Sequence, residues 1–238
     1  MSAVQALVFA RCLGFVVRAP GFSHPSVPAP VRACFALVLA LALARGRVLA
    51  DVSTAALVPA LAIELALGAA IGVAASALYD GAYSGGRLVD DYVGIRISVP
   101  TAGIVAGAGF GRLWSLAFVA AFFAFGGHRV LLAALAGTFD WLPPGAALRP
   151  VAFAAFATAV PGTLVRAALA VAGPALALAF ATQLALAAIA RVVPRFSTFA
   201  LAFAIVLGVA LLATVVEVPA LLPVAARPWL DLDALRGR

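Results

Sequence analysis

The stretch that decides the fold is FAFGGHRVLLAALAGTFDWLPPG, over Phe123–Gly145. It begins with closely spaced aromatic residues, continues with Gly126, Gly127 and His128, and ends after an apolar run at two consecutive prolines. A soluble core helix would not need this junction. A plain membrane-spanning helix would be weakened by it, because glycine and proline both disfavour helix. The pattern therefore indicates a flexible hinge at Gly126, Gly127 and His128, and a stop about fifteen residues later at the two prolines.

The composition places the chain in a membrane or in an assembly embedded in one. Its 238 residues are 66% hydrophobic and 11% charged, with a mean hydropathy of +1.17. Soluble domains are about half apolar and about a quarter charged, so this chain has too little polar surface for a globule in water. The net charge of +7 is the difference between 16 arginines, which are scattered among apolar runs, and 9 acidic residues. Nucleic-acid binding needs a basic patch, so we expect these charges to face lipid headgroups and no nucleic acid.

No pattern in the sequence indicates a metal, a cofactor or catalysis. The two histidines have no carboxylate cluster beside them, which a metal site would need. Cys12 and Cys34 lie in apolar runs, which favours small core side chains over a disulfide. Ser84 precedes two glycines and could be the nucleophile of an intramembrane protease. The Gly-x-Ser-x-Gly sequence is absent, however, and His128 is the only candidate base. We therefore expect no enzyme.

The apolar runs predict an all-α, polytopic membrane protein of about six short, kinked or hairpin-forming helical segments. Two uncharged runs, Ala167–Ala190 and Phe196–Val216, would extend about 36 Å and about 31 Å as helices, which matches a hydrocarbon core of about 30 Å. The other runs are shorter or carry a charge. We expect them over residues 3–17, 31–44, 55–78, 101–125 and 151–165.

Three prolines, Pro59, Pro161 and Pro174, fall inside these otherwise helical patterns. Each removes a backbone hydrogen bond from a helix, so we expect broken helices at these positions. Lipid does not tolerate broken backbone, whereas protein surroundings or a water-filled lumen do. The sequence therefore predicts helices that pack in an assembly rather than a standard bundle.

A turn at a membrane interface is predicted near the end of the chain. A long uncharged helix ends at Arg191, turns at Pro194 and re-enters after Arg195. Two arginines around a proline are typical of a stop and turn at the headgroups. We expect one membrane-embedded domain over residues 1–221, followed by a short polar tail over residues 222–238.

Glu64 begins a stripe of small residues, because Gly68 and Gly72 follow it at four-residue spacing. Residues spaced in this way share one face of a helix. A carboxylate followed by small residues suits close helix–helix contact, with the acid facing another helix rather than lipid. The alternative is an acid near the end of a span that reaches to the interface.

A second stripe consists of Gly103, Gly107 and Gly111, with Gly109 and Arg112 beside it. Glycine disfavours a helix by about 1 kcal/mol per residue, so something must compensate for so many. One interpretation is a glycine-rich packing face. The other is a segment without regular helix that lies at a constriction as a flexible flap.

The charged stretch between the two stripes covers residues 79–96 and leaves two interpretations open. The first is an ion-pair network at a membrane surface or a subunit boundary, and the second is a solvated loop. The adjacent acids Asp90 and Asp91 cannot share one helix face as a catalytic pair. The charged residues concerned are Asp80, Arg87, Asp90, Asp91 and Arg96.

In chain order these features resemble the flagellar biosynthesis protein FliR and its injectisome counterpart SctT, the SpaR/YscT/HrcT family of type III secretion export gates. No single piece is specific, but their order and spacing together are. Arg195 stands where the family has a glutamine. The matching features are Arg11, Pro20, the apolar run at 27–43, ELALG at 64–68, AYSGGRLVDDYVG at 82–94, Pro100, Arg112-Leu113, GGH at 126–128, GTFDWLPPG at 137–145 and the run at 172–199.

The resemblance implies a structural, pore-forming core subunit of an export gate. Its partners would be membrane subunits similar to FliP and FliQ (SctR and SctS), a switch protein similar to FlhB (SctU), and unfolded export substrates. It would lie in the bacterial inner membrane, in the basal body of a flagellum or an injectisome. The glycines at 126 and 127 would bend a helical hairpin. The loop after Pro100 would match the plug of the closed channel, which contains Gly103, Gly107 and Gly109.

A small secondary transporter is the alternative function. Proline-broken helices with intramembrane charges, here Glu64 and Arg112, also occur in transporters. A transporter of this kind should contain inverted internal repeats, and we find none in the sequence. It should also transport by itself in liposomes.

Overall fold

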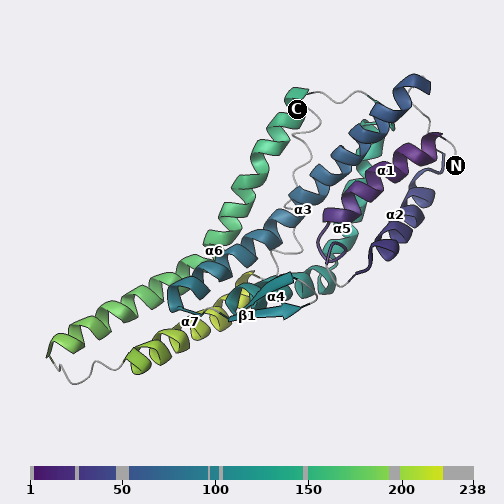
Figure 1. Cartoon of the computed structure of the whole chain (residues 1–238). Helices are drawn as coiled ribbons and strands as arrows, with labels where there is room; N and C mark the ends of the chain where they lie inside the picture. Colours follow the sequence, from purple (N-terminus) through teal and green to yellow (C-terminus); the bar gives the residue numbers. More distant parts are fainter. Residues whose placement is uncertain are drawn as a thin grey trace. The chain divides into compact units, whose positions relative to one another are not determined.

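The computed structural model describes residues 3–24, 27–46, 54–95, 97–101, 104–146, 150–192 and 199–221. These residues are mostly helical, which confirms the predicted class (Figure 1). A two-stranded antiparallel sheet, which the sequence did not predict, is inserted between the third and fourth helices. The elements are α1 (Ala3–Arg18), α2 (Ala29–Leu43), a 3-10 turn (Thr54–Ala56), α3 (Leu57–Val93), β1 (Ile97–Thr101), β2 (Ile104–Ala108), α4 (Phe110–Ala124), α5 (Gly127–Trp141), α6 (Pro150–Val192) and α7 (Phe199–Leu221).

The chain divides into two compact units. The first unit contains α1, α2, the part of α3 up to Leu78, α5, and the part of α6 up to Gly162. The second unit contains α3 from Tyr79, both strands, α4, α6 from Thr163, and α7.

Three helices within the described residues are long and apolar enough to cross a membrane: Leu57–Val93, Phe153–Val192 and Ala202–Leu221. The pair α4 and α5 is a fourth candidate if it is taken as one broken span. The predicted crossing Ala167–Ala190 lies inside α6, and the described part of the run that begins at Phe196 lies inside α7. The chain is therefore a helical membrane protein.

In the first unit α1 packs along α2, and the two helices lie side by side in Figure 1. Where the chain turns between them, the rings of Phe22 and Phe35 stack with their centroids 4.7 Å apart. The inner face of α1 is fully buried, and it contributes Leu7 and Phe15 to the core of the unit. Apolar residues of α5, such as Leu135, are fully buried as well.

The core of the second unit contains a group of aromatic rings. Tyr79 of α3 meets Phe118 and Phe122 of α4 edge to face, with centroid distances of 6.3 Å and 5.6 Å. Trp114 packs against Phe118 in the same way. Edge-to-face contacts suit the charge distribution of aromatic rings, so this group fixes α4 on the C-terminal half of α3.

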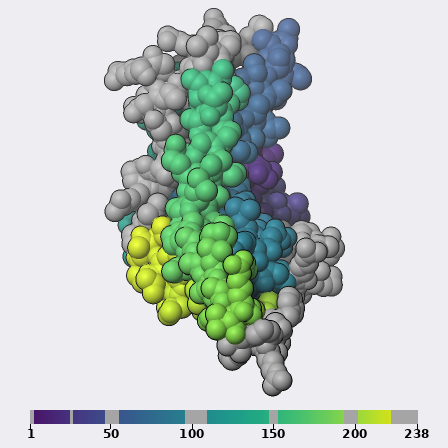
Figure 2. All heavy atoms as spheres, turned by 90° about the vertical axis from the view of Figure 1, so that its left-hand side faces the viewer, coloured from purple at the N-terminus to yellow at the C-terminus, as the bar shows by residue number. Residues whose placement is uncertain are grey.

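The outward faces of the last two helices are apolar. On α6, Leu169, Phe180 and Leu184 are more than half exposed. On α7, Leu212 and Val216 are exposed to a similar extent. Figure 2 shows the side chains of α6, in green, uncovered on the face turned to the viewer. Large exposed apolar surfaces of this kind indicate contact with lipid or with another protein.

Pro161 and Pro174 do not break α6, and the prediction of broken helices there is wrong. The expected runs 151–165 and 167–190 merge into one helix. A proline removes one helical hydrogen bond, whereas a break in an apolar medium leaves several backbone groups unsatisfied at several kcal/mol each. The continuous helix is therefore the less costly arrangement.

The charged stretch after Leu78 is helical over residues 79–93, so the interpretation as a solvated loop is wrong there. Arg87 and Asp91 of this stretch form an ion pair at 3.9 Å, and the interpretation as a network at a membrane surface or a subunit boundary stays a prediction. The buried residues of the stretch, Tyr79, Ala82, Val89 and Val93, recur every three to four positions or multiples of that spacing, which places them on one helix face. Residues 104–108, in contrast, form a strand rather than part of a helix. For this part of the glycine-rich segment, the interpretation without regular helix is the right one.

Several predictions lie outside the described residues. They concern Gly103 in the candidate plug, Pro194 and Arg195 in the candidate turn, and the polar tail over 222–238.

Candidate functional site

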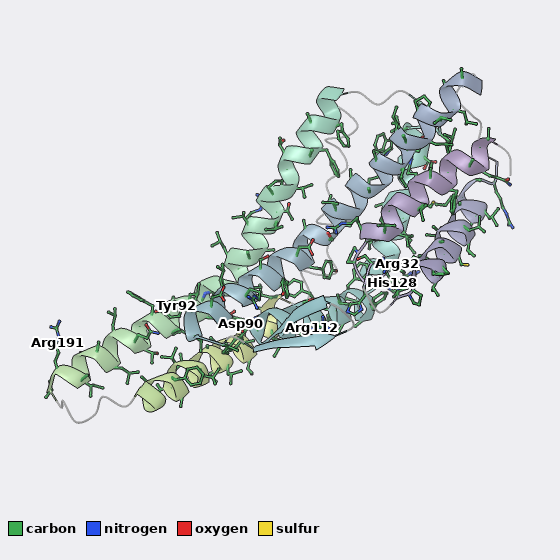
Figure 3. All side chains as sticks on the ribbon, viewed as in Figure 1. Arg32, Asp90, Tyr92, Arg112, His128 and Arg191 are labelled. Atoms are coloured by element: carbon green, nitrogen blue, oxygen red, sulfur yellow. The ribbon has the colours of Figure 1, made fainter. Side chains whose placement is uncertain are left out.

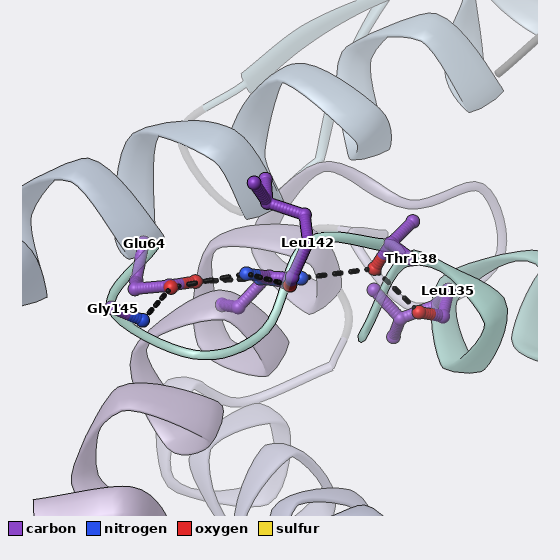
Figure 4. Close-up of polar contacts among 6 residues, drawn as sticks. Glu64, Leu135, Thr138, Leu142 and Gly145 are labelled. Atoms are coloured by element: carbon purple, nitrogen blue, oxygen red, sulfur yellow. Dashed lines mark hydrogen bonds and ion pairs between the residues drawn. The ribbon is translucent and has the colours of Figure 1, made fainter. Parts of the chain in front are cut away.

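A buried ion pair joins α1 to α3 in the first unit (Figure 4). Arg11 donates from Nε and Nη2 to the two carboxylate oxygens of Glu64, and the distance from Nη2 to Oε1 is 3.0 Å. The side chains are 0% and 3% exposed. The guanidinium carbon also lies 4.2 Å from the centroid of the Phe139 ring, where the ring face attracts a cation. Two parallel charged hydrogen bonds fix both the distance and the orientation of the two helices.

The same pair holds the chain where α5 ends. Arg11 donates from Nη1 to the Thr138 hydroxyl at 3.2 Å and from Nη2 to the Leu142 carbonyl at 3.1 Å. Glu64 Oε1 accepts the backbone N–H of Gly145 at 2.9 Å. The segment that follows α5, from Leu142 to Gly145, is therefore held to α1 and α3 by hydrogen bonds (Figure 4).

The small-residue stripe on α3 lies directly against α1. A Cβ atom at Gly68 would collide with the backbone carbonyl of Arg11, and one at Gly72 would lie 2.7 Å from the carbonyl oxygen of Phe15. Contacts this close are available only to glycine, and they let two helix backbones touch. The stripe thus brings Glu64 within reach of Arg11.

In the second unit Asp90 caps α4. It lies near the end of α3, is 1% exposed, and accepts the backbone N–H groups of Phe110 at 2.7 Å and Gly111 at 3.1 Å. These are two of the N–H groups that a helix start leaves without a helical partner, and the helix dipole favours a negative charge there. The preceding Gly109 has φ 146°, and a Cβ atom at that position would collide with the Asp90 carboxylate. Glycine meets both demands.

The strands β1 and β2 form the hairpin between α3 and α4. Their register runs from Ile97 opposite Ala108 to Thr101 opposite Ile104. Of the predicted plug residues, Pro100 lies in β1 and Gly107 lies in β2, opposite Ser98. Gly109 lies between β2 and α4.

The helices at the base of this hairpin are held closely together. A Cβ atom at Gly86 of α3 would lie 2.6 Å from the Cα atom of Gly111 in α4, so the two backbones are in contact. The Tyr92 hydroxyl donates to Gln183 Oε1 of α6 at 3.1 Å. Figure 3 shows Asp90 and Tyr92 on α3; Arg112 is half-buried in the first turn of α4.

The predicted hinge coincides with the break between α4 and α5. Gly126 has φ 78°, a left-handed conformation that suits glycine and ends a helix. Gly127 begins α5 and is buried, and His128 follows it, half-buried (Figure 3). Arg191 lies exposed in the last turn of α6.

Two polar residues have structural roles that the sequence did not show, and a third polar residue is buried. Asp90 caps a helix that begins twenty residues later, and Thr138 completes the coordination of Arg11. Within the described part of the chain, the carboxylate oxygens of Glu217 in α7 are buried and have no hydrogen-bond partner. The helical spacing of Asp90 with Tyr79 and Val93 could have identified its buried position, whereas nothing local in the sequence indicates the other two.

The family described as Bacterial export proteins, family 1, matches residues 3–231. No curated protein matches the chain. Among the described residues, no group of three or more His, Cys, Asp or Glu side chains is placed to hold a metal ion.

Proposed function

Because the chain belongs to family 1 of the bacterial export proteins, we propose that it is a structural, pore-forming core subunit of a type III protein export gate, in a flagellum or an injectisome. The match covers nearly the whole chain and confirms the resemblance to the FliR and SctT family. Its apolar helices make it a membrane protein of bacterial protein export. The proposal adds the role within the gate.

The observation that supports this role is the hairpin over Ile97–Ala108. It occupies the glycine-rich segment that corresponds, through the resemblance, to the plug of the closed channel. A two-stranded sheet is marginally stable by itself, so it can be displaced more easily than a packed helix. This property suits a plug, which must yield to a substrate without disturbing the helices around it.

We propose that the exposed apolar faces of α6 and α7 contact sister subunits similar to FliP and FliQ, and that a switch protein similar to FlhB also joins the gate. The location would be the bacterial inner membrane, within a basal body. Unfolded proteins would be the substrates. The chain would catalyse no reaction, and the energy for export would come from partner proteins or an ion gradient.

Co-purification tests the role in assembly. The chain, produced together with its FliP-like and FliQ-like subunits and extracted in mild detergent, should elute with both as one stable complex. Elution of the chain alone would contradict the proposal. Transport of a small solute by the chain alone in liposomes would instead favour a transporter.

Substitution of Gly107 tests the plug. Gly107→Trp should block export while the complex still assembles, because an indole on β2 enlarges a segment that has to move past other surfaces. Gly107→Ala, which adds one methyl group at the same position, is the matched control and should retain more export. Unchanged secretion by the tryptophan variant would count against the plug.

A further inference from the structure

Both ends of the hairpin segment are hydrogen-bonded to Asp90. The Asp90 backbone carbonyl accepts the N–H groups of Gly94 at 2.9 Å and Ile95 at 2.8 Å, where the chain leaves α3. The Asp90 carboxylate accepts those of Phe110 and Gly111, where the chain enters α4. We call these five residues the Asp90 clamp. Between its two sides lie both strands of the hairpin.

The two sides of the clamp differ in strength. On the α3 side, the bond from Ile95 to Asp90 spans five residues and accompanies Gly94 with φ 88°, which is a common way to end a helix. This side needs only the backbone. On the α4 side the acceptor is a buried carboxylate, and hydrogen bonds to an ionised group are about twice as strong as neutral ones. A side-chain substitution therefore opens one side of the clamp and leaves the other intact.

The surroundings of the clamp are rigid. The contact between Gly86 and Gly111 holds the backbones of α3 and α4 together, and Tyr92 is hydrogen-bonded to Gln183 of α6. The two strands of the hairpin are paired with each other by an antiparallel ladder. Any displacement that spares these helices must therefore occur beyond the clamp.

We propose that Asp90 is the positioning residue of the hairpin. Its carboxylate keeps the two ends of the segment together, so that the hairpin moves aside as one closed loop and returns to the same position after a substrate has passed. This inference rests on the proposed plug function. Without the carboxylate, the α4 end of the segment separates from α3, and the hairpin no longer closes the channel reliably.

Ion permeability of the resting complex tests the inference. Complexes of the full chain with its partner subunits are reconstituted in liposomes, and efflux of potassium is measured in the absence of any substrate. Asp90→Asn should raise the efflux by about tenfold, because losing one charged hydrogen bond shifts a closed-to-open equilibrium by about that factor. Asp91→Asn is the matched control, since that side chain is 63% exposed and pairs with Arg87 only at 3.9 Å. Its potassium efflux should equal that of the wild type.

Two further variants make the outcome decisive. Replacing residues 97–108 by a Gly-Ser linker removes the hairpin, and this variant should leak if the hairpin obstructs a pore. A linker variant with no more potassium efflux than the wild type would refute the plug. If the linker variant leaks potassium but the Asp90→Asn complex does not, only the clamp is refuted. Should Asp90→Asn fail to assemble, Gly109→Ala displaces the carboxylate without removing its charge. A tight Gly109→Ala complex would then overturn the inference.

Discussion

Removing one member of the buried ion pair should strongly destabilise the chain. In Glu64→Ala, Arg11 loses the acceptor for Nε and one of the two acceptors for Nη2, and the Gly145 N–H loses its acceptor too. Arg11 keeps the Thr138 hydroxyl and the Leu142 carbonyl, but neither carries a charge. Breaking a buried pair in this way costs about 3–5 kcal/mol, chiefly because a buried charge is left uncompensated.

Double substitutions separate the charge from the packing. Arg11→Met combined with Glu64→Leu leaves no buried charge and should recover most of the lost stability, apart from about 1–3 kcal/mol for the unpaired Gly145 N–H. Exchanging the two charges should not restore stability. A carboxylate at position 11 would face the Leu142 carbonyl, and a guanidinium at position 64 would face the Gly145 N–H.

The free energy of unfolding should be measured by denaturant titration of the full chain in detergent, for the wild type, Glu64→Ala and the exchanged pair. The wild type, Arg11→Met, Glu64→Leu and the variant that combines these two substitutions are measured in the same way and form a double-mutant cycle. The four members of the cycle give the coupling energy between the two residues. A loss below about 1 kcal/mol in Glu64→Ala is typical of an exposed pair and would refute the buried one. Full recovery in the exchanged pair would refute the role of Leu142 and Gly145.

Three further predictions concern packing, a lone acid and the cysteines. Gly68→Ala should lower the free energy of unfolding by about 1–3 kcal/mol, because the new methyl group overlaps the backbone of α1. Gly137 has open space around it, so the control variant Gly137→Ala should stabilise α5 by up to about 1 kcal/mol. Equal losses of stability at both positions would contradict the close contact between α1 and α3. Glu217→Gln should leave the unfolding temperature unchanged or raise it, because a neutral amide is less costly to bury than an unpaired carboxylate; a clear drop would mean that the carboxylate has a partner in the assembly. Burial raises the pKa of the Cys12 thiol to about 12. Maleimide should therefore label the exposed Cys34 of the detergent-solubilised chain and leave Cys12 unlabelled. Equal labelling rates at the two cysteines would show that α1 is not buried.

The sequence predicted the features that depend on short-range patterns. Composition gave the membrane class, and the four-residue spacing of Gly68 and Gly72 from Glu64 indicated a helix contact with an inward acid. The partner of that acid, Arg11, could not be identified, because it lies 53 residues away on another helix. Pairing between distant segments depends on how the chain folds back, which local spacing does not contain.

The errors have a common physical cause, which is the weight given to single residues over the helical period. Considered singly, prolines and charges predict the ends of helices, although an apolar environment makes a continuous helix more favourable than a break. The charged neighbours of Asp90 predict a surface network or a loop, yet Asp90 follows the buried face of α3. The hairpin was missed because glycines at four-residue spacing fit both a helix face and a strand that has no need of large side chains.

The length of α6 bears on what covers the chain. Its 43 residues extend about 64 Å as a helix, so fitting it entirely into a hydrocarbon core of about 30 Å would need a tilt of about 60°, well beyond the usual range for membrane helices. Its two charges, Arg166 and Arg191, lie about 37 Å apart along the axis, which suits a crossing between them. The uncharged part that precedes Arg166 then lies beyond the lipid core, where exposure to water is unfavourable. A protein surface must cover it, and membership in the export family provides one, because it implies assembly with other components of the apparatus.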